Sequence, residues 1–119
     1  EEQDLILDRL REDRFLSEKR FAESFTRGKF RSNRWGKLKI RYALAQKGIS
    51  DQDIRHGLKE IPDEEYEEGL RYILNQKIDR LKPELSKLEK RQRLYAFAQQ
   101  KGYEMDWIKR TIKDLDKQL

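Results

Sequence analysis

The residues best suited to bind a partner lie between Ser24 and Ser50, where the sequence has no acidic side chain. Basic side chains recur through this stretch, at Arg27, Lys29, Arg31, Arg34, Lys37, Lys39, Arg41 and Lys47. An acidic run, Asp63–Glu68, follows, although the net charge of the whole chain is only +5. This separation of charge creates a local positive field that suits phosphates or an acidic protein surface. A run of charges is also typical of a solvated helix face, so both interpretations stay open.

Arginine and tryptophan in this stretch indicate what it can contact. Arginine presents planar, paired donors to phosphate or carboxylate, whereas lysine acts as a mobile point charge. Lys37 and Arg41 are one helical turn apart and can share a patch. Trp35 can stack on a base or insert into a partner pocket, but packing against Phe30 or Leu38 explains it equally well. The candidate partner- or nucleic-acid-binding residues are Arg27, Lys29, Arg31, Arg34, Trp35, Lys37, Lys39 and Arg41.

Catalysis finds little support in the sequence. His56 is the single histidine and cysteine is absent, so any scheme that pairs histidine with a nucleophile rests on one residue. The six glycines are scattered singly and form no phosphate-binding loop. The carboxylates of Asp63–Glu68 suggest a metal less than a helix N-terminus, where the helix dipole favours negative charge. We therefore expect a binding protein that is not an enzyme, with no cofactor, metal or small-molecule substrate.

Composition favours small helical units over one deep core. Of the 119 residues, 35% are hydrophobic and 43% are charged, which is apolar-poor for a globular domain. Units that each bury a modest face against a neighbour fit this balance, and 10% aromatic residues argue against disorder. No apolar run approaches the roughly 20 residues that span a bilayer. The lack of cysteine agrees with a reducing compartment, so we expect a cytoplasmic protein with no membrane partner.

Hydrophobic spacing and capping signals predict helices throughout the chain and no strand. A first helix is expected at Gln3–Arg11, and Ser17 is predicted to cap a second. Residues 32–36 indicate a tight connection to a third helix, which should end at Lys47-Gly48 because glycine tolerates a left-handed backbone. Further helices are predicted over Ser50–Ile61, from Asp63 to about Leu81, from Pro83 in a first turn to Lys101-Gly102, and around Trp107–Leu115. Their spacing places five aromatic residues mostly in the core: Phe21, Phe25, Tyr42, Phe97 and Trp107.

The chain contains an internal repeat. A shift of 54 residues places Leu44–Ile49 on Ala98–Tyr103. The apolar positions that follow keep this register and pair Ile54 with Ile108, Leu58 with Ile112 and Ile61 with Leu115. A shift of 48 pairs Ala22 with Leu70, Phe25 with Ile73 and Phe30 with Ile78, so the later copy has six extra residues. The sequence therefore predicts an all-α fold of tandem three-helix repeats in an elongated array: the last helix of a truncated first repeat at 1–14, a second repeat at 15–61 and a third at 62–119.

Several short motifs of the second repeat have a distinctive order. They are Arg20-Phe21-Ala22, Phe25, Arg27, Arg31, Arg34-Trp35-Gly36, Ile40, Leu44 and Lys47-Gly48-Ile49. This pattern resembles the central repeat of the RecX family, and residues 63–115 resemble the family's third repeat more loosely. Ser17 stands where the family usually has an acidic residue, and the third repeat lacks the arginine-rich loop, so we do not expect it to share the contact role. Because the chain begins at Glu1 rather than methionine, we interpret it as a fragment that lacks most of a first repeat.

The resemblance implies a regulator that lodges in the groove of the RecA–DNA filament and usually suppresses ATP hydrolysis and strand exchange in recombination and DNA repair. Composition and spacing do not identify this partner. One alternative is direct binding of single- or double-stranded DNA, because Leu44, Gly48 and Ile54 have the spacing of a helix-turn-helix motif. Asp51 and Asp53, at the start of its second helix, would repel phosphates. Another alternative is a structural helical repeat with no specific site.

Overall fold

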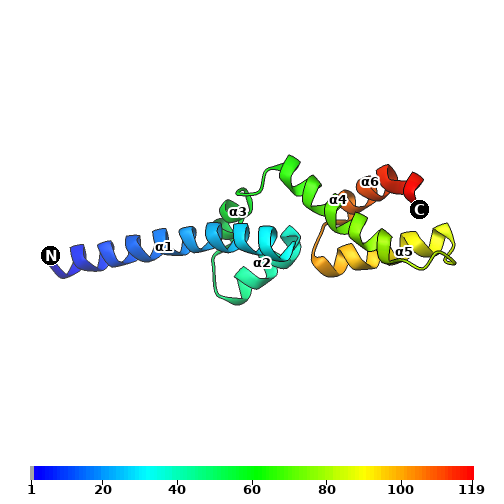
Figure 1. Cartoon of the computed structure of the whole chain (residues 1–119). Coiled ribbons are helices and arrows are strands. Elements are labelled where there is room, and N and C mark those ends of the chain that lie inside the picture. The colour runs from blue at the N-terminus through cyan, green and yellow to red at the C-terminus, as the bar shows by residue number, and fades with distance from the viewer. Residues whose placement is uncertain (1) are drawn as a thin grey trace.

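The computed structural model describes residues 2–119, apart from the side chains of residues 2–4, 7, 8 and 15, and this part of the chain contains helices and no strand. Its elements are α1 (Glu2–Asn33), α2 (Lys37–Gln46), α3 (Asp51–Leu58), α4 (Asp63–Arg80), α5 (Lys87–Lys101), α6 (Met105–Leu115) and a 3₁₀ turn, η1 (Asp116–Gln118). They form an elongated array of 73 × 23 × 21 Å (Figure 1). The predicted all-α class and elongated shape are confirmed. No helix in the described part is long and apolar enough to cross a membrane.

The first helix is longer than the sequence pattern indicated. We predicted a break between Arg11 and Ser17, but α1 runs unbroken for 32 residues and Ser17 lies inside it. No proline or glycine interrupts residues 11–17, and most of them are good helix formers, so one exposed serine does not end the helix. The first half of α1 projects away from the rest of the molecule (Figure 1). Its described apolar side chains are therefore exposed: Leu5, Ile6, Leu10 and Leu16.

Two three-helix units follow one another along the molecule. The N-terminal unit, residues 17–61, packs the second half of α1 against α2 and α3, and the C-terminal unit, residues 63–115, packs α4 against α5 and α6. Equivalent positions are buried in both, as the predicted register requires: Ile40 and Leu94, Leu44 and Ala98, Ile54 and Ile108, Leu58 and Ile112. The turns between the second and third helices also agree, because Gly48 has φ +82° and Gly102 has φ +97°. These values confirm the predicted glycine stops.

Helix caps agree with the prediction at Ser50 and differ at Pro83. The Ser50 hydroxyl accepts a hydrogen bond of 3.2 Å from the Asp53 N–H, as expected for the cap of α3. Pro83 was predicted in the first turn of a helix, but it lies in the connection before α5, which begins at Lys87. The reason is a capping box: the Ser86 hydroxyl and the Glu89 carboxylate each accept from the other's backbone N–H. The capping box satisfies the backbone N–H groups of Ser86 and Glu89. This stabilises a helix start at Lys87 more than the fixed φ of Pro83 stabilises an earlier one.

The junction between the units is a backbone contact around two glycines. The corner between α1 and α2 meets the turn between α5 and α6, where Gly36 N–H donates to the Lys101 carbonyl at 2.8 Å and Leu38 N–H donates to the Gly102 carbonyl at 2.9 Å. A Cβ on Gly36 would lie 2.3 Å from the Gly102 carbonyl carbon, so only glycine permits this approach. The chain backbone therefore fixes one unit against the other.

Aromatic rings complete the junction. Tyr66 stacks on Tyr103 at 5.0 Å and lies 5.8 Å from Phe30. Its buried hydroxyl accepts from the Lys37 N–H at 2.9 Å and donates to the Glu104 carboxylate. Burial raises the pKa of the Tyr66 hydroxyl, and the bond to Glu104 raises it further. The hydroxyl therefore stays protonated and able to donate.

Candidate functional site

The structure divides the eight candidate contact residues among different surroundings. They lie on the last turns of α1, in the connection Arg34–Gly36 and on α2, so the predicted corner exists. They do not form one uniform patch. Two arginines face carboxylates, two cations face single aromatic rings at the junction, and two lysines flank Trp35. The environment of each group decides how much positive charge it presents to a partner.

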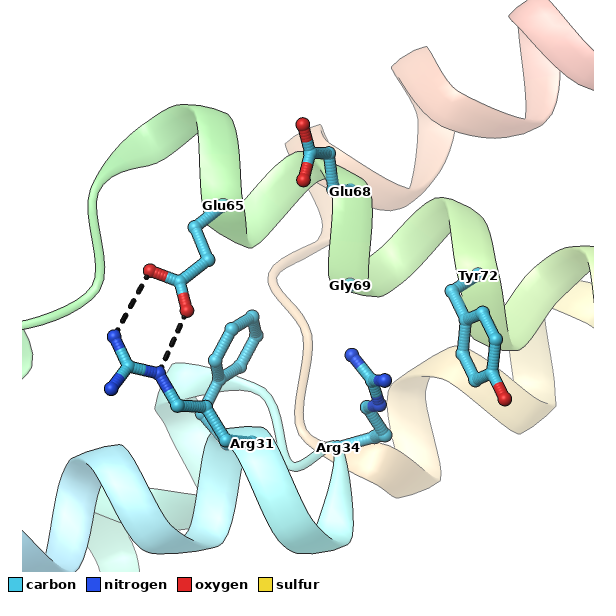
Figure 2. Close-up of a pocket in the computed structure, with 7 residues that line it drawn as sticks. Arg31, Arg34, Glu65, Glu68, Gly69 and Tyr72 are labelled. Atoms are coloured by element: carbon cyan, nitrogen blue, oxygen red, sulfur yellow. Dashed lines mark hydrogen bonds and ion pairs between the residues drawn. The ribbon is translucent and has the colours of Figure 1, made fainter.

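Arg27 and Arg31 form ion pairs with acidic residues from the segment that joins the units. Arg27 lies 3.1 Å from Glu60, and Arg31 binds the Glu65 carboxylate through two nitrogens, at 2.9 and 3.3 Å (Figure 2). The hydrogen bond from Arg31 lowers the pKa of the Glu65 carboxyl group. Both pairs remain partly exposed, but their charge is largely balanced. These two arginines therefore add less to a positive surface than the sequence suggested.

Arg34 closes the end of α1 and points toward α4. Its backbone has φ +58°, a left-handed conformation that costs a non-glycine residue about 1–2 kcal/mol. Its carbonyl accepts from the Tyr103 hydroxyl at 3.2 Å, and its guanidinium lies 4.4 Å from the Tyr72 ring centroid. Both groups line a groove of about 380 Å³ between α1 and α4, together with Glu65 and Glu68 (Figure 2). The acidic wall makes this groove a poor site for an anion.

Lys37 and Arg41, predicted to share a patch, have different surroundings. The Lys37 ammonium donates to the Ile61 carbonyl at 3.3 Å and lies 5.0 Å from the Tyr66 ring centroid. It therefore helps to join the end of α3 to the corner. Arg41 is exposed and forms no ion pair among the residues that the structure describes. Only Arg41 of this pair is fully available to a partner.

Lysines from α1 and α2 gather around Trp35, which lies in the connection between these helices. The Lys29 and Lys39 ammonium groups lie 4.9 and 4.8 Å from the Trp35 ring centroid. Phe25 packs edge-on against Trp35, with ring centroids 6.4 Å apart. Lys47, from the turn after α2, lies 5.7 Å from the Phe25 ring. We call Lys29, Lys39 and Lys47, with Phe25 and Trp35, the cationic ledge.

The cationic ledge keeps its charge. None of its three lysines forms an ion pair within the described part of the chain. Trp35 is half-buried. Its ring packs against Phe25 and the core, and its remaining surface is open to solvent. Cations held over aromatic faces are partly ordered before a partner arrives, which reduces the entropy cost of binding. The ledge can therefore hold a phosphate or a carboxylate.

Sequence reasoning missed part of this ledge and misplaced two aromatic residues. Phe25 was assigned to the core alone, although the spacing Phe21, Phe25, Lys29 along α1 indicates one stripe on a helix. Phe21 and Tyr42, also expected in the core, are 43% and 67% exposed. The unit is too small to cover every aromatic ring. Phe97 and Trp107 are half-buried and pack against the core, near their expected places.

The residues considered for catalysis or metal binding lie on the helices. His56 of α3 lies 3.4 Å from Glu23 of α1. The acidic residues Asp63, Glu64 and Glu65 lie in the first turn of α4, as predicted for a helix N-terminus. Within the described residues, no group of three or more potential metal ligands comes together.

Family profiles account for both units. Residues 17–58 match the second three-helix domain of RecX, and residues 63–112 match the third. The chain belongs to the RecX family. Two RecX proteins with the name "Regulatory protein RecX" illustrate the relationship: the one from Clostridium botulinum (strain Alaska E43 / Type E3) is 35% identical over 109 residues, and the one from Clostridium acetobutylicum is 31% identical over 113 residues.

The matches cover most of this chain but only part of the relatives. The two alignments include 91% and 92% of the chain, and 50% and 52% of the relatives. The crystal structure of RecX from Lactobacillus salivarius superposes with a TM-score of 0.77 at 25% identity, over 83% of this chain and 64% of that one. The chain thus spans about half the length of the curated RecX proteins it matches, with the same helical architecture.

Proposed function

We propose that this RecX chain regulates recombination by docking on RecA–DNA filaments in the cytoplasm. Its effect there is to restrain ATP hydrolysis and strand exchange. Its relatives are named regulatory proteins, and the resemblance of the sequence implies RecA as partner. We further propose that residues 1–14 end a first repeat, while 15–61 and 62–119 are the second and third repeats. The observation that carries the docking proposal is the cationic ledge, whose lysines have no carboxylate partner in the described part of the chain.

Charge complementarity supports this docking mode. A filament of DNA and protein presents phosphates and acidic side chains, which attract an exposed cationic surface from a distance. The two arginine ion pairs reduce the positive surface without removing it, because the ledge and Arg41 stay outside them. The binding energy is therefore expected from Lys29, Lys39, Lys47 and Arg41 more than from Arg27 and Arg31.

Titration of the chain into RecA filaments on single-stranded DNA tests the proposal. The test variant is Lys29→Gln with Lys39→Gln and Lys47→Gln, and the matched control is Lys109→Gln with Lys113→Gln and Lys117→Gln, which removes the same charge from exposed positions near the C-terminus. The parent and the control should lower the ATP turnover of the filament equally. The test variant should need about ten times more protein for the same effect, since charges that meet a partner govern association. Equal potency of all three would refute the ledge as the docking surface.

Direct reading of duplex DNA by a helix-turn-helix motif has weaker support. α3 would be the recognition helix, and its Arg55 is paired with Asp51 at 2.8 Å. Asp53 is buried in the first turn of the helix. The carboxylates balance the charge of Arg55 and repel DNA phosphates, so this helix is poorly suited to enter a DNA groove. Tight, salt-dependent binding of duplex DNA that Arg55→Gln abolishes would favour this alternative.

A further inference from the structure

A groove between α4 and α5 repeats the chemistry of the cationic ledge in the C-terminal unit. The groove encloses about 230 Å³ and is lined by Lys77, Arg93, Ala96, Phe97 and Gln100. The Lys77 ammonium lies 5.3 Å from the Phe97 ring centroid. Lys77 and Phe97 are half-buried, whereas Arg93 and Gln100 are exposed. The groove thus combines an aromatic face, two cations and an amide that are open to solvent.

The internal repeat relates the two cations of this groove to two lysines of the ledge. In the register that the buried residues confirm, Lys77 is equivalent to Lys29, Arg93 to Lys39 and Gln100 to Gln46. The aromatic residue differs, because Trp35 comes from the corner of one unit and Phe97 from α5 of the other. Two cations therefore recur at matching positions in both units, and in each unit they lie at a site with an aromatic ring. From the sequence, without an arginine-rich loop, the C-terminal unit was not expected to share the contact role of the second repeat.

Nearby acids do not neutralise this groove. Neither Lys77 nor Arg93 takes part in an ion pair in the part of the chain that the structure describes. Glu89 lies one turn before Arg93, but its carboxylate accepts the Ser86 N–H at 3.2 Å in the capping box. That backbone bond is the main cause of the lowered pKa of Glu89, and the charge of Arg93 is a minor one. The two cations remain free to bind an external anion.

The junction between the units brings the two sites close together, because Lys39 of the ledge packs against Gly102, two residues after Gln100 of the groove. α2 lies on the same side of α1 as α5 does of α4 (Figure 1). Each site lies between the first and second helices of its unit. The two sites follow each other along an array that is 73 Å long. An extended ligand can therefore run past both.

We propose that the two sites hold one single strand of nucleic acid, with phosphates at the lysine and arginine side chains and bases against Trp35 and Phe97. The proposal rests on the proposed function, because it names the strand within the filament as the partner of the ledge. A single strand offers alternating charges and flat faces, and proteins bind it with basic grooves and aromatic platforms. An acidic protein surface would use the cations but not the recurring aromatic rings.

Fluorescence anisotropy with labelled oligo-dT of about 30 nucleotides tests the second site. The test variant is Lys77→Gln with Arg93→Gln, and the control is Lys109→Gln with Lys113→Gln. Lys109 and Lys113 line a separate groove with Arg91 and Tyr95, so the control removes equal charge from another face of the same unit. With five phosphate contacts, one for each lysine or arginine of the two sites, the parent should show a log–log salt slope of about −0.7 × 5, or −3.5. The test variant should lose about two-fifths of this slope and bind about tenfold more weakly, with the control unchanged.

A second variant separates stacking from charge. Phe97→Leu keeps an apolar side chain in the core but removes the ring, so it should weaken oligo-dT binding severalfold without changing the salt slope. If Lys77→Gln with Arg93→Gln binds oligo-dT as the parent does, the second site is wrong. The same conclusion follows if polyglutamate competes as well as oligo-dT, because the grooves would then select carboxylates.

The filament assay distinguishes this inference from the proposed function. One outcome is that the variant at Lys29, Lys39 and Lys47 no longer regulates RecA, while the variant at Lys77 and Arg93 binds oligo-dT as the parent does. In that case the docking proposal stands and the strand-binding inference falls. If variants at both sites lose oligo-dT but still restrain RecA fully, the strand-binding sites stand and the docking proposal falls.

Discussion

The turns Lys47–Ile49 and Lys101–Tyr103 have nearly the same sequence pattern and very different surroundings. Each follows the second helix of a unit, and each has a glycine with positive φ. Nothing lies within 4 Å of a Cβ built on Gly48, whereas one built on Gly102 would lie 2.3 Å from the Lys39 Cβ. The local sequence alone thus determines the shape of the turn. The contact between the units determines how strongly the stability of the protein depends on each turn.

Gly102→Ala should have the largest effect on stability. The new methyl group meets the backbone and Cβ of Lys39 and forces a left-handed conformation on alanine, so we expect a loss of about 3–5 kcal/mol. Urea denaturation followed by circular dichroism measures the loss. A loss below that of Gly48→Ala would contradict the close contact between the units.

Tyr66→Phe should have the next largest effect. The ring still fills the junction, but the Lys37 N–H and the Glu104 carboxylate both lose their partner. Leaving these groups unpaired in a partly buried place should cost about 2–3 kcal/mol. The control is Tyr72→Phe, at an exposed hydroxyl that accepts only from Gln76 in the described structure. Equal stability of the two variants in urea would show that the Tyr66 hydroxyl does not join the units.

Gly48→Ala should lower stability only through the strain of a left-handed backbone. Alanine at φ +82° has no steric neighbour, so about 1–2 kcal/mol is expected from the left-handed conformation alone. Thermal unfolding of this variant beside Gly102→Ala measures the difference between an exposed and a buried copy of the same turn. If the two variants unfold alike, the comparison between the turns fails.

Glu65→Gln should have the smallest effect, and that effect should depend on pH. Arg31 lowers the pKa of Glu65 in the folded chain, so the ion pair adds stability above the ordinary pKa of a glutamate. This contribution is lost as the pH falls through the lowered value, and parent and variant should then converge. Glu68→Gln, on the same helix, is the control. A stability difference that persists in acid would contradict the role of the ion pair.

Much of the fold could be predicted from the sequence because its signals are local. The glycine stops, the Ser50 cap and the periodic apolar residues each act within a few neighbours. The start of α5 was misjudged because the reciprocal Ser86–Glu89 bonds outweigh Pro83. The unbroken α1 shows that a serine among good helix formers does not end a helix.

The candidate site was predicted less well because its charges are set by distant partners. Arg31 meets Glu65, which lies 34 residues away in the sequence, only when the two units pack together. The partial burial of Phe25 and the exposure of Phe21 likewise depend on how much surface a small unit can cover. Residue types therefore indicated a basic corner, but packing decides that Lys29 and Lys39 present its charge and that Arg27 and Arg31 do not.

Amide hydrogen exchange of the chain, with and without RecA filaments on single-stranded DNA, tests the docking surface most directly. Bound filaments should slow exchange in peptides that cover residues 29–47, while peptides from α6 keep their rates. Unchanged exchange over residues 29–47 in a chain that is fully bound to filaments would contradict the proposed role of the cationic ledge.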